Sequence, residues 1–263
     1  MHNNKLITAV SLSLVVTGVA HAASADETST LDDVQAAGEV RVCTTGDYKP
    51  FTYWNAETES FEGIDIDMAE NLASALGVET RFVKTSWPTL MEDFTAGKCD
   101  IAMGGISVKL DRQAQAYFSD PYLAGGKTPI ARCDDVERFQ RVEQINQPDV
   151  DVVVNPGGTN ERFARRELAD ANIMVHDDNT TIFGKIVDGT ADVMVTDAIE
   201  TELQANLNAE LCAVHPDAPF TYSEKGYLLP RGDDVWKAWV DQWLHLVRKT
   251  GEFESIYAKW VEG

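Results

Sequence analysis

The sequence predicts an α/β protein of two lobes, and three features of its pattern support that prediction. Short apolar runs typical of buried strands alternate with segments of helical periodicity, as in parallel sheets covered by helices. The alternation forms two clusters, at about residues 38–125 and 128–221, with similar internal order. After the second cluster come a further extended run and helices without strand partners, so the chain is expected to return to the first lobe.

The first cluster is expected to begin with a short helix and a strand, at residues 32–37 and 39–43. Residues 47–51 predict a turn-rich loop with exposed aromatic side chains. A helix with one apolar face should extend from Gly63 to Leu76, where Gly77 ends it. The remaining elements predicted here are a strand at 80–83, a helix at 89–96 and a buried strand at 100–103.

The second cluster repeats this order. Strands are predicted at 128–133, 150–154, 173–175 and 191–195, and helices at 161–168 and 180–188. An extended run at 222–229 and a helical tail at 233–260 follow. In that tail the apolar side chains recur at helical spacing, which favours core packing over a ligand site; they are Trp236, Val240, Trp243 and Val247.

Two crossings between the lobes are expected, near Gly125-Gly126 and near Glu224-Lys225, and together they would form a hinge beside a cleft. The predicted lobes are therefore residues 24–125 with 226–263, and residues 126–225. Residues 1–23 are expected to be a cleavable secretory signal, because Lys5 precedes an apolar segment that ends at the small-residue site Ala20-His21-Ala22. That segment is shorter than the ~20 residues of a membrane span, so we expect an exported, periplasmic protein without one.

The chain carries a formal net charge of −21. Lys5 is the only charged residue before Asp26, so loss of the signal would leave −22. Such acidity argues against nucleic acid or an anionic membrane as the partner, and we hypothesise that it reflects a saline habitat. A few cations lining the cleft could still bind a small anion.

Four cysteines are present. Cys43 and Cys99 adjoin apolar runs, which favours buried thiols, whereas Cys133 and Cys212 flank the second lobe and could form a disulfide. The cysteine and histidine spacings do not match a zinc site, and no nucleotide-binding motif or Ser/His/Asp order is present. We therefore expect neither a metal nor a cofactor.

Three loops should meet at the cleft, because each follows a buried strand where open sheets bind ligands. In the first, Gly105 and Ser107 can donate hydrogen bonds to a carboxylate and Arg112 can clamp it; an ordinary glycine turn is the alternative. The second is a strand-to-helix turn that forms an anion cradle, with Asn155, Gly158, Thr159 and Asn160.

The third loop carries Asp197 and Glu200, one helical turn apart. Asp197 could bind an ammonium group or cap the following helix. Glu200 could donate a proton near pH 7 if it faces a dry cleft, and a solvated helical glutamate is the equally weighted alternative. Tyr48, Phe51 and Trp87 could pack against a ring, and Lys127 could add a second cation.

The chain resembles the family-3 periplasmic amino-acid-binding proteins, on the residues Gly63-Ile64-Asp65-Ile66-Asp67, Gly105-Ile106-Ser107 with Arg112, and Asp120-Pro121-Tyr122. That resemblance implies the two-lobed (type II) periplasmic-binding-protein fold, with two mixed, mostly parallel sheets, a double-crossover hinge and a cleft between the lobes. It also implies that Arg112 would hold an α-carboxylate and Asp197 an α-amino group.

A more specific resemblance is to the cyclohexadienyl dehydratases within that class. It is carried by Thr85-Ser86-Trp87-Pro88, Gly125-Gly126-Lys127-Thr128-Pro129-Ile130, Thr196-Asp197-Ala198-Ile199-Glu200 and the runs at 44–51, 154–161 and 210–216. It implies a carbon–oxygen lyase that dehydrates and decarboxylates prephenate and L-arogenate without a cofactor. Glu200 would be the general acid, with Asn155, Asn160, Trp87 and Lys127 around the ligand. The alternative is a non-catalytic amino-acid receptor of an ABC importer, which would release its ligand intact.

Overall fold

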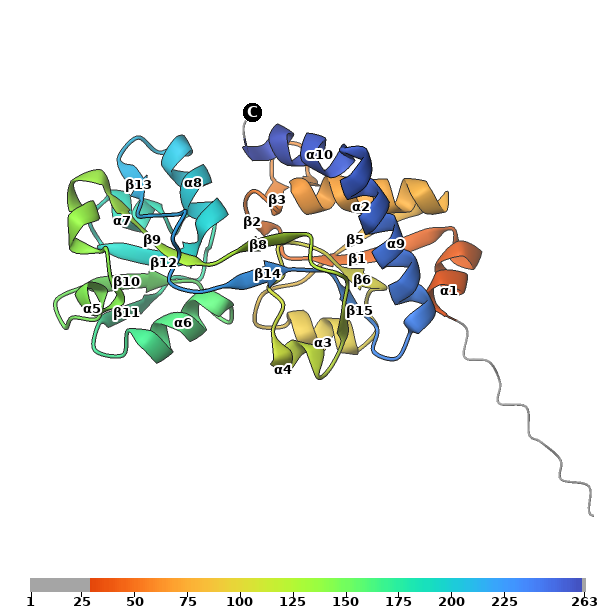
Figure 1. Cartoon of the computed structure of the whole chain (residues 1–263), viewed down its shortest axis with the longest axis horizontal. Helices are drawn as coiled ribbons and strands as arrows, with labels where there is room; N and C mark the ends of the chain where they lie inside the picture. The colour runs from red at the N-terminus through yellow and green to blue at the C-terminus, as the bar shows by residue number, and fades with distance from the viewer. Residues whose placement is uncertain (1–28, 262–263) are drawn as a thin grey trace, which may run out of the picture.

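The computed structural model describes residues 29–261 and shows two lobes, each built around a five-stranded sheet (Figure 1). The sheet of the first lobe has the order β5 (Glu79–Lys84), β1 (Glu39–Thr44), β6 (Ile101–Ala102), β15 (Leu228–Leu229) and β7 (Tyr117–Phe118). β1 runs parallel to both of its neighbours. β15 returns from the end of the second lobe and pairs antiparallel with β6 and β7.

The sheet of the second lobe has the order β11 (Asn172–Val175), β10 (Asp151–Val154), β12 (Val193–Asp197), β9 (Lys127–Arg132) and β13 (Leu211–Ala213). β10 is parallel to β11 and β12, whereas β9 is antiparallel to β12 and β13. Both sheets are therefore mixed, as predicted. Their antiparallel share is larger than the expected mostly parallel pattern, because the strands next to the hinge run back between the lobes.

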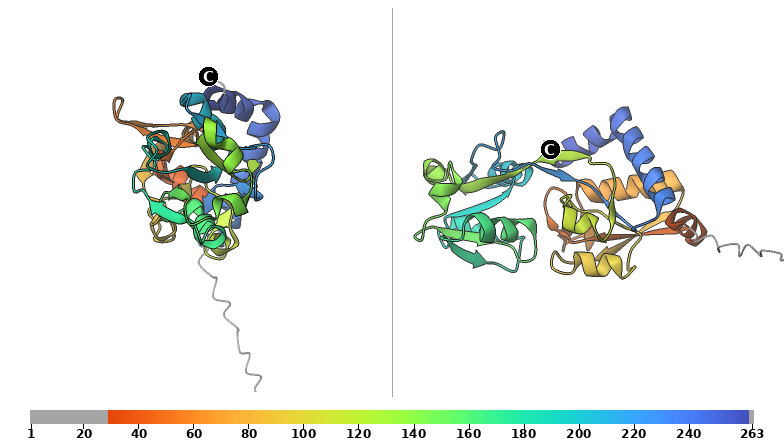
Figure 2. Two further views of the ribbon diagram at one scale, coloured as in Figure 1. Left: turned by 90° about the vertical axis from the view of Figure 1, so that its left-hand side faces the viewer. Right: turned by 60° about the horizontal axis from the view of Figure 1, so that its bottom comes forward.

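The hinge is a two-stranded antiparallel ribbon between the lobes, formed by β8 (Leu123–Gly125) and β14 (Ser223–Lys225) (Figure 2). The two predicted crossings lie on this ribbon or directly after it. The exact limits of the lobes remain a prediction. The expected signal at residues 1–23 lies outside the described residues, and within residues 29–261 we find no helix with the length and apolarity of a membrane span.

Helices cover both sheets, and the long C-terminal helices pack on the first lobe (Figure 1). The tail tryptophans Trp236 and Trp243 are buried, which confirms their predicted core role. The single helix expected there is divided at Gly251, whose φ of 84° favours glycine. The first lobe carries α1 (Thr30–Ala37), α2 (Ile64–Leu76), α3 (Leu90–Thr95), α4 (Leu110–Gln113), α9 (Asp234–Thr250) and α10 (Glu252–Val261). The second carries η1 (Cys133–Arg138), α5 (Val142–Ile145), α6 (Thr159–Glu167), α7 (Gly184–Val187) and α8 (Ala198–Leu207).

The expected loop with exposed aromatics is instead part of a small sheet of β2 (Asp47–Tyr48), β3 (Thr52–Asn55) and β4 (Ser60–Glu62). Tyr48 and Phe51 are buried, so the prediction of exposure was wrong. Both rings pack against Gly105, where a Cβ atom would lie 2.6 Å from each. This contact joins segments far apart in the sequence, and glycine is required there to admit the rings.

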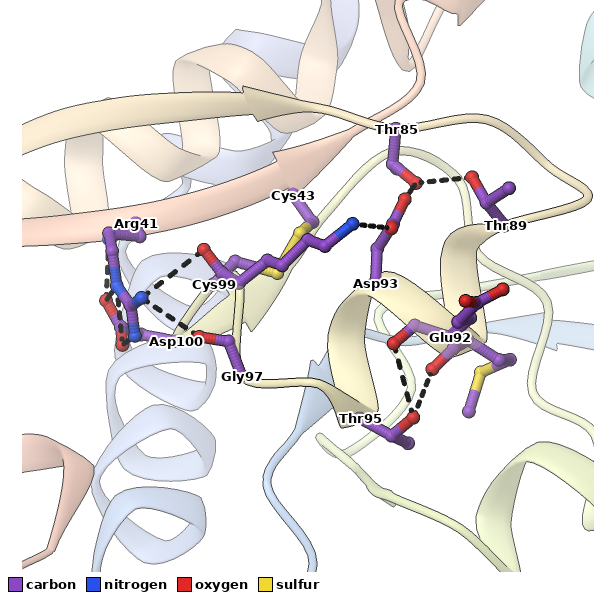
Figure 3. The surroundings of a disulfide bond; sticks show 12 residues. Arg41, Cys43, Thr85, Thr89, Glu92, Asp93, Thr95, Gly97, Cys99 and Asp100 are labelled. Atoms are coloured by element: carbon purple, nitrogen blue, oxygen red, sulfur yellow. Dashed lines mark hydrogen bonds and ion pairs between the residues drawn. A yellow bond between two sulfur atoms is a disulfide. The ribbon is translucent and has the colours of Figure 1, made fainter.

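Cys43 and Cys99 form a disulfide, so the prediction of buried thiols was wrong (Figure 3). Because β1 and β6 are parallel neighbours, with Val42 opposite Ile101, the two Cα atoms come within 5.6 Å. An ion pair of 2.6 Å between Arg41 and Asp100 joins the same two segments. The Cys133–Cys212 disulfide is confirmed, with its cysteines brought together by the antiparallel pairing of β9 and β13.

Replacing both Cys43 and Cys99 by alanine is expected to lower the free energy of unfolding by about 2–4 kcal/mol, because the bridge restricts the unfolded chain. Urea unfolding followed by circular dichroism measures this. The double replacement of Cys133 and Cys212 is the matched comparison in the other lobe. An unchanged unfolding midpoint for the first double variant would contradict a stabilising Cys43–Cys99 bridge.

Candidate active site

Asp197 binds two lysine side chains at the junction of the lobes. It ends β12 opposite Lys127 of β9, and this antiparallel register places both side chains on one face of the sheet. Lys127 Nζ lies 2.9 Å from one carboxylate oxygen, and Lys225 Nζ of the hinge lies 2.7 Å from the other. The Tyr48 hydroxyl donates to the second oxygen. Burial alone would raise the pKa of Asp197, but the two lysines hold it well below its usual range.

The sequence suggested that Asp197 either binds an ammonium group or caps the following helix, and the structure does not show the cap. Its side chain makes no capping hydrogen bond to α8, although the helix begins directly after it. Instead its carboxylate binds two ammonium groups that belong to the protein itself. Sequence reasoning missed Lys225 as a site residue, and its Nζ also lies 3.1 Å from Ser107 Oγ in the first lobe.

A chain of hydrogen bonds leads from Lys127 to Glu200. Lys127 Nζ donates to Asn160 Oδ1, and Asn160 Nδ2 donates to Asn155 Oδ1 and Thr196 Oγ1, at 3.0 and 2.9 Å. Because an ammonium group can only donate, it fixes the orientation of the Asn160 amide. Thr196 therefore receives one hydrogen bond and gives its own proton to Glu200 Oε2.

Glu200 is only 2% exposed on α8, so the alternative of a solvated helical glutamate is wrong. Burial raises the pKa of Glu200 to about 8, the charge of Asp197 adds to the rise, and the Thr196 hydrogen bond opposes it. Within residues 29–261, its second oxygen Oε1 has no hydrogen-bond partner. A carboxyl group with such a pKa is mostly protonated at pH 7 and can act as an acid.

Arg112 is a third buried cation of the site, held by α4. Its Nη1 donates to the Ser107 carbonyl oxygen at 3.0 Å, and no carboxylate of the described chain forms an ion pair with it. Burial, with a smaller contribution from Arg162, lowers the pKa of Arg112 to about 10, so it remains charged at neutral pH. An uncompensated buried guanidinium is well suited to bind a ligand carboxylate.

These groups surround a narrow cavity between the lobes. The predicted site residues line it, apart from Phe51, Lys127 and Glu200. Phe51 packs beneath Gly105, Lys127 reaches the cavity wall through Asp197 and Asn160, and Glu200 lines an adjoining hollow. The lining residues are Tyr48, Trp87, Gly105, Ser107, Arg112, Asn155, Gly158, Thr159, Asn160, Asn179, Asp197 and Lys225.

Asn179 is a further lining residue that the sequence analysis missed. Its Nδ2 donates to the Asp47 carbonyl oxygen at 2.8 Å, which ties the second lobe to the first. Its Oδ1 is buried without a partner, and the residue lines both the cavity and the hollow that holds Glu200. Trp87 closes the cavity nearby, with its ring packed edge-on against Tyr48 and its Nε1 donating to the Asp47 carboxylate. In residues 29–261, no cluster of His, Cys, Asp or Glu could hold a metal ion.

Comparison with known proteins identifies one family. The model for the bacterial extracellular solute-binding proteins, family 3, matches residues 40–263. The cyclohexadienyl dehydratase of Pseudomonas aeruginosa is 56% identical over 234 residues, which span 89% of this chain and 87% of that protein. The L-cystine-binding protein of Escherichia coli K12 is 24% identical over 94% of this chain and 91% of its own length.

Solved structures give the same two kinds of relative. An ancestral amino-acid-binding protein, described as a precursor of cyclohexadienyl dehydratase, has a TM-score of 0.82 and 36% identity; the match covers 89% of this chain and 100% of that one. An ancestral cyclohexadienyl dehydratase has 49% identity and a TM-score of 0.58, and covers 90% and 98% of the two chains.

Proposed function

Because this chain belongs to the bacterial extracellular solute-binding proteins of family 3, we propose that it is a catalytic member of that class, a cyclohexadienyl dehydratase. It converts prephenate to phenylpyruvate, and L-arogenate to L-phenylalanine. The observation that carries the proposal is Glu200, a buried carboxyl group with a pKa of about 8 beside a cavity lined by cations. The 56% identity to a dehydratase supports it.

The reaction requires one proton, delivered to the ring hydroxyl. Because it eliminates water by breaking a carbon–oxygen bond, the enzyme is a carbon–oxygen lyase. Glu200 donates its proton to the ring hydroxyl as the carbon–oxygen bond breaks, and water leaves. The carbon–carbon bond to the ring carboxylate breaks as well, and its electron pair enters the ring, which becomes aromatic while CO₂ departs. Glu200 then regains a proton from solvent. A positioned acid typically contributes roughly 10²–10⁴-fold to such a step.

The cations of the cavity hold the substrate's carboxylates. Arg112 binds one of them through its guanidinium fork. Lys127 and Lys225 together carry two positive charges, and Asp197 carries one negative charge. The remaining positive charge can bind the second carboxylate of the substrate. Asn155, Thr159 and Asn160 orient the ring, and Trp87 excludes water.

The occupied carboxylate of Asp197 favours an enzyme over an amino-acid receptor. A receptor would use Asp197 to hold the α-amino group of its ligand. In this structure both oxygens of Asp197 already bind lysine ammonium groups. A ligand ammonium would have to displace a buried ion pair, which is costly.

The cellular location fits this function. We propose that the protein is periplasmic, which is supported by its extracellular family and by two disulfides of the kind found in oxidising compartments. We propose that residues 1–23 direct its export.

Thr196→Val is expected to extend activity to higher pH by about one unit, because the variant loses a hydrogen bond of ~1.4 kcal/mol that favours ionised Glu200. The pKa of Glu200 then rises further, and the acid form persists at higher pH. The pH profile of kcat/KM measures the shift. Thr201→Val on α8, the helix of Glu200, is the matched control, since that buried hydroxyl donates to the Ala198 carbonyl oxygen instead. An unshifted profile in Thr196→Val would show that Thr196 does not tune the acid.

The proposed function is tested by incubating purified protein with prephenate and with L-arogenate. We expect phenylpyruvate and L-phenylalanine to form together with CO₂. Recovery of both compounds unchanged, with tight binding of an amino acid in their place, would identify a transport receptor.

A further inference from the structure

A second hollow adjoins the cavity at Ser107 and Thr159, which line both. It lies where α4 of the first lobe faces α6 of the second (Figure 1). Its charged lining residues are four cations and a single carboxylate: Lys109, Lys127, Arg162, Arg166 and Asp111. We refer to this surface as the cationic groove.

The charge of the cationic groove is opposite to that of the molecule, which carries a net charge of −21. Lys109 is half-buried, and its amine has no hydrogen-bond or ion-pair partner in residues 29–261. Burial lowers the pKa of Lys109, and the charges of Lys127, Arg162 and Arg112 lower it further, whereas the charge of Asp197 opposes this shift. Lys127, Arg162 and Arg166 are paired with Asp197, Asp111 and Glu167. Within residues 29–261, Lys109 is thus the groove cation without a carboxylate partner, and an anion that joined it would offset its repulsion from the neighbouring cations.

One ion pair crosses the groove between the lobes. Arg162 on α6 lies 2.9 Å from Asp111 on α4, and both side chains are largely exposed. Exposed pairs of this kind contribute little stability, so an incoming carboxylate can displace Asp111 from Arg162 at small cost.

A dianionic substrate is repelled by this protein as a whole, yet it must reach a cavity between the lobes. We propose that the cationic groove is a docking site for small carboxylate anions, from which the substrate enters the cavity past Ser107 and Thr159. This inference rests on the proposed function. Local fields of this kind raise association rates by about 10–10³-fold, and salt suppresses the effect.

The test is the association rate of prephenate with protein carrying Glu200→Gln, followed by tryptophan fluorescence in a stopped-flow instrument. Trp87 in the cavity wall is the reporter. Lys109→Gln should lower the rate roughly three- to tenfold at about 0.01 M ionic strength and much less near 1 M, where the Debye length is ~3 Å. Asp111→Asn should raise the rate at low salt. Lys249→Gln, an equal charge change at an exposed residue of α9 outside the groove, is the control and should leave the rate unchanged.

An association rate that falls in Lys109→Gln and rises in Asp111→Asn, and does so only at low salt, supports docking in the cationic groove. Rates equal to the control in both variants overturn it, while prephenate turnover by the wild-type protein would leave the dehydratase assignment intact. If the wild-type protein neither binds nor converts prephenate, both proposals fail.

Discussion

Glu200→Gln is expected to lower kcat for prephenate by roughly 10²–10⁴-fold, the usual contribution of a positioned general acid. Glutamine keeps the size of the side chain, and its carbonyl oxygen can still accept the Thr196 hydrogen bond, so the site should keep its geometry. What is lost is the ionisable proton. Steady-state kinetics with prephenate, followed by phenylpyruvate formation, measures the effect.

Binding separates this loss from a structural defect. Prephenate should still bind to Glu200→Gln, because Arg112 and the two lysines are untouched. Glu202→Gln is the matched control, since Glu202 lies on the same helix but is exposed outside the cavity. Activity of Glu200→Gln close to that of the Glu202 variant would remove Glu200 from the chemistry.

Arg112→Ala is expected to lower kcat/KM by roughly 30- to 5,000-fold, which corresponds to the ~2–5 kcal/mol lost when one partner of a buried charge pair is removed. The reason is that a substrate carboxylate would enter the cavity without its guanidinium. Because the carboxylate is held both before and during the reaction, the effect should fall mainly on KM. Arg112→Lys keeps the charge without the planar fork and should lose less.

Arg231→Ala provides a control for Arg112. Arg231 also lies in the first lobe and also donates to a single backbone carbonyl, that of Ala114, but it is exposed and away from the cavity. Its removal should leave the kinetics unchanged. Equal KM values for Arg112→Ala and Arg231→Ala would contradict the binding role of Arg112.

The parts of the site that could be predicted from the sequence are the residues that come directly after a buried strand. A buried strand followed by a polar loop identifies a strand end, and strand ends of an open sheet converge. For this reason the sequence alone predicts that Gly105, Asn155 and Asp197 lie near one cavity, and the structure brings them together. The burial of Glu200 could not be decided in this way, because a helical glutamate one turn from a strand can face either solvent or the cleft.

Other features depend on contacts between distant segments. Lys225 reaches Asp197 because β14 of the hinge passes beside the end of β12, and Asn179 reaches Asp47 only when the lobes meet. The Cys43–Cys99 disulfide depends on which strands are neighbours in the sheet. Local periodicity carries no information about any of these pairings.

The pH dependence of kcat/KM for prephenate tests whether a protonated, buried Glu200 drives the reaction. This quantity reports the ionisation of the free protein. Since the pKa of Glu200 is raised to about 8 and the acid form is the active one, the rate should stay constant up to about pH 8. Above that it should fall about tenfold per pH unit. A rate that instead rises from pH 6 to pH 9 would show that the reaction needs a base, and would contradict the assignment of Glu200 as the acid.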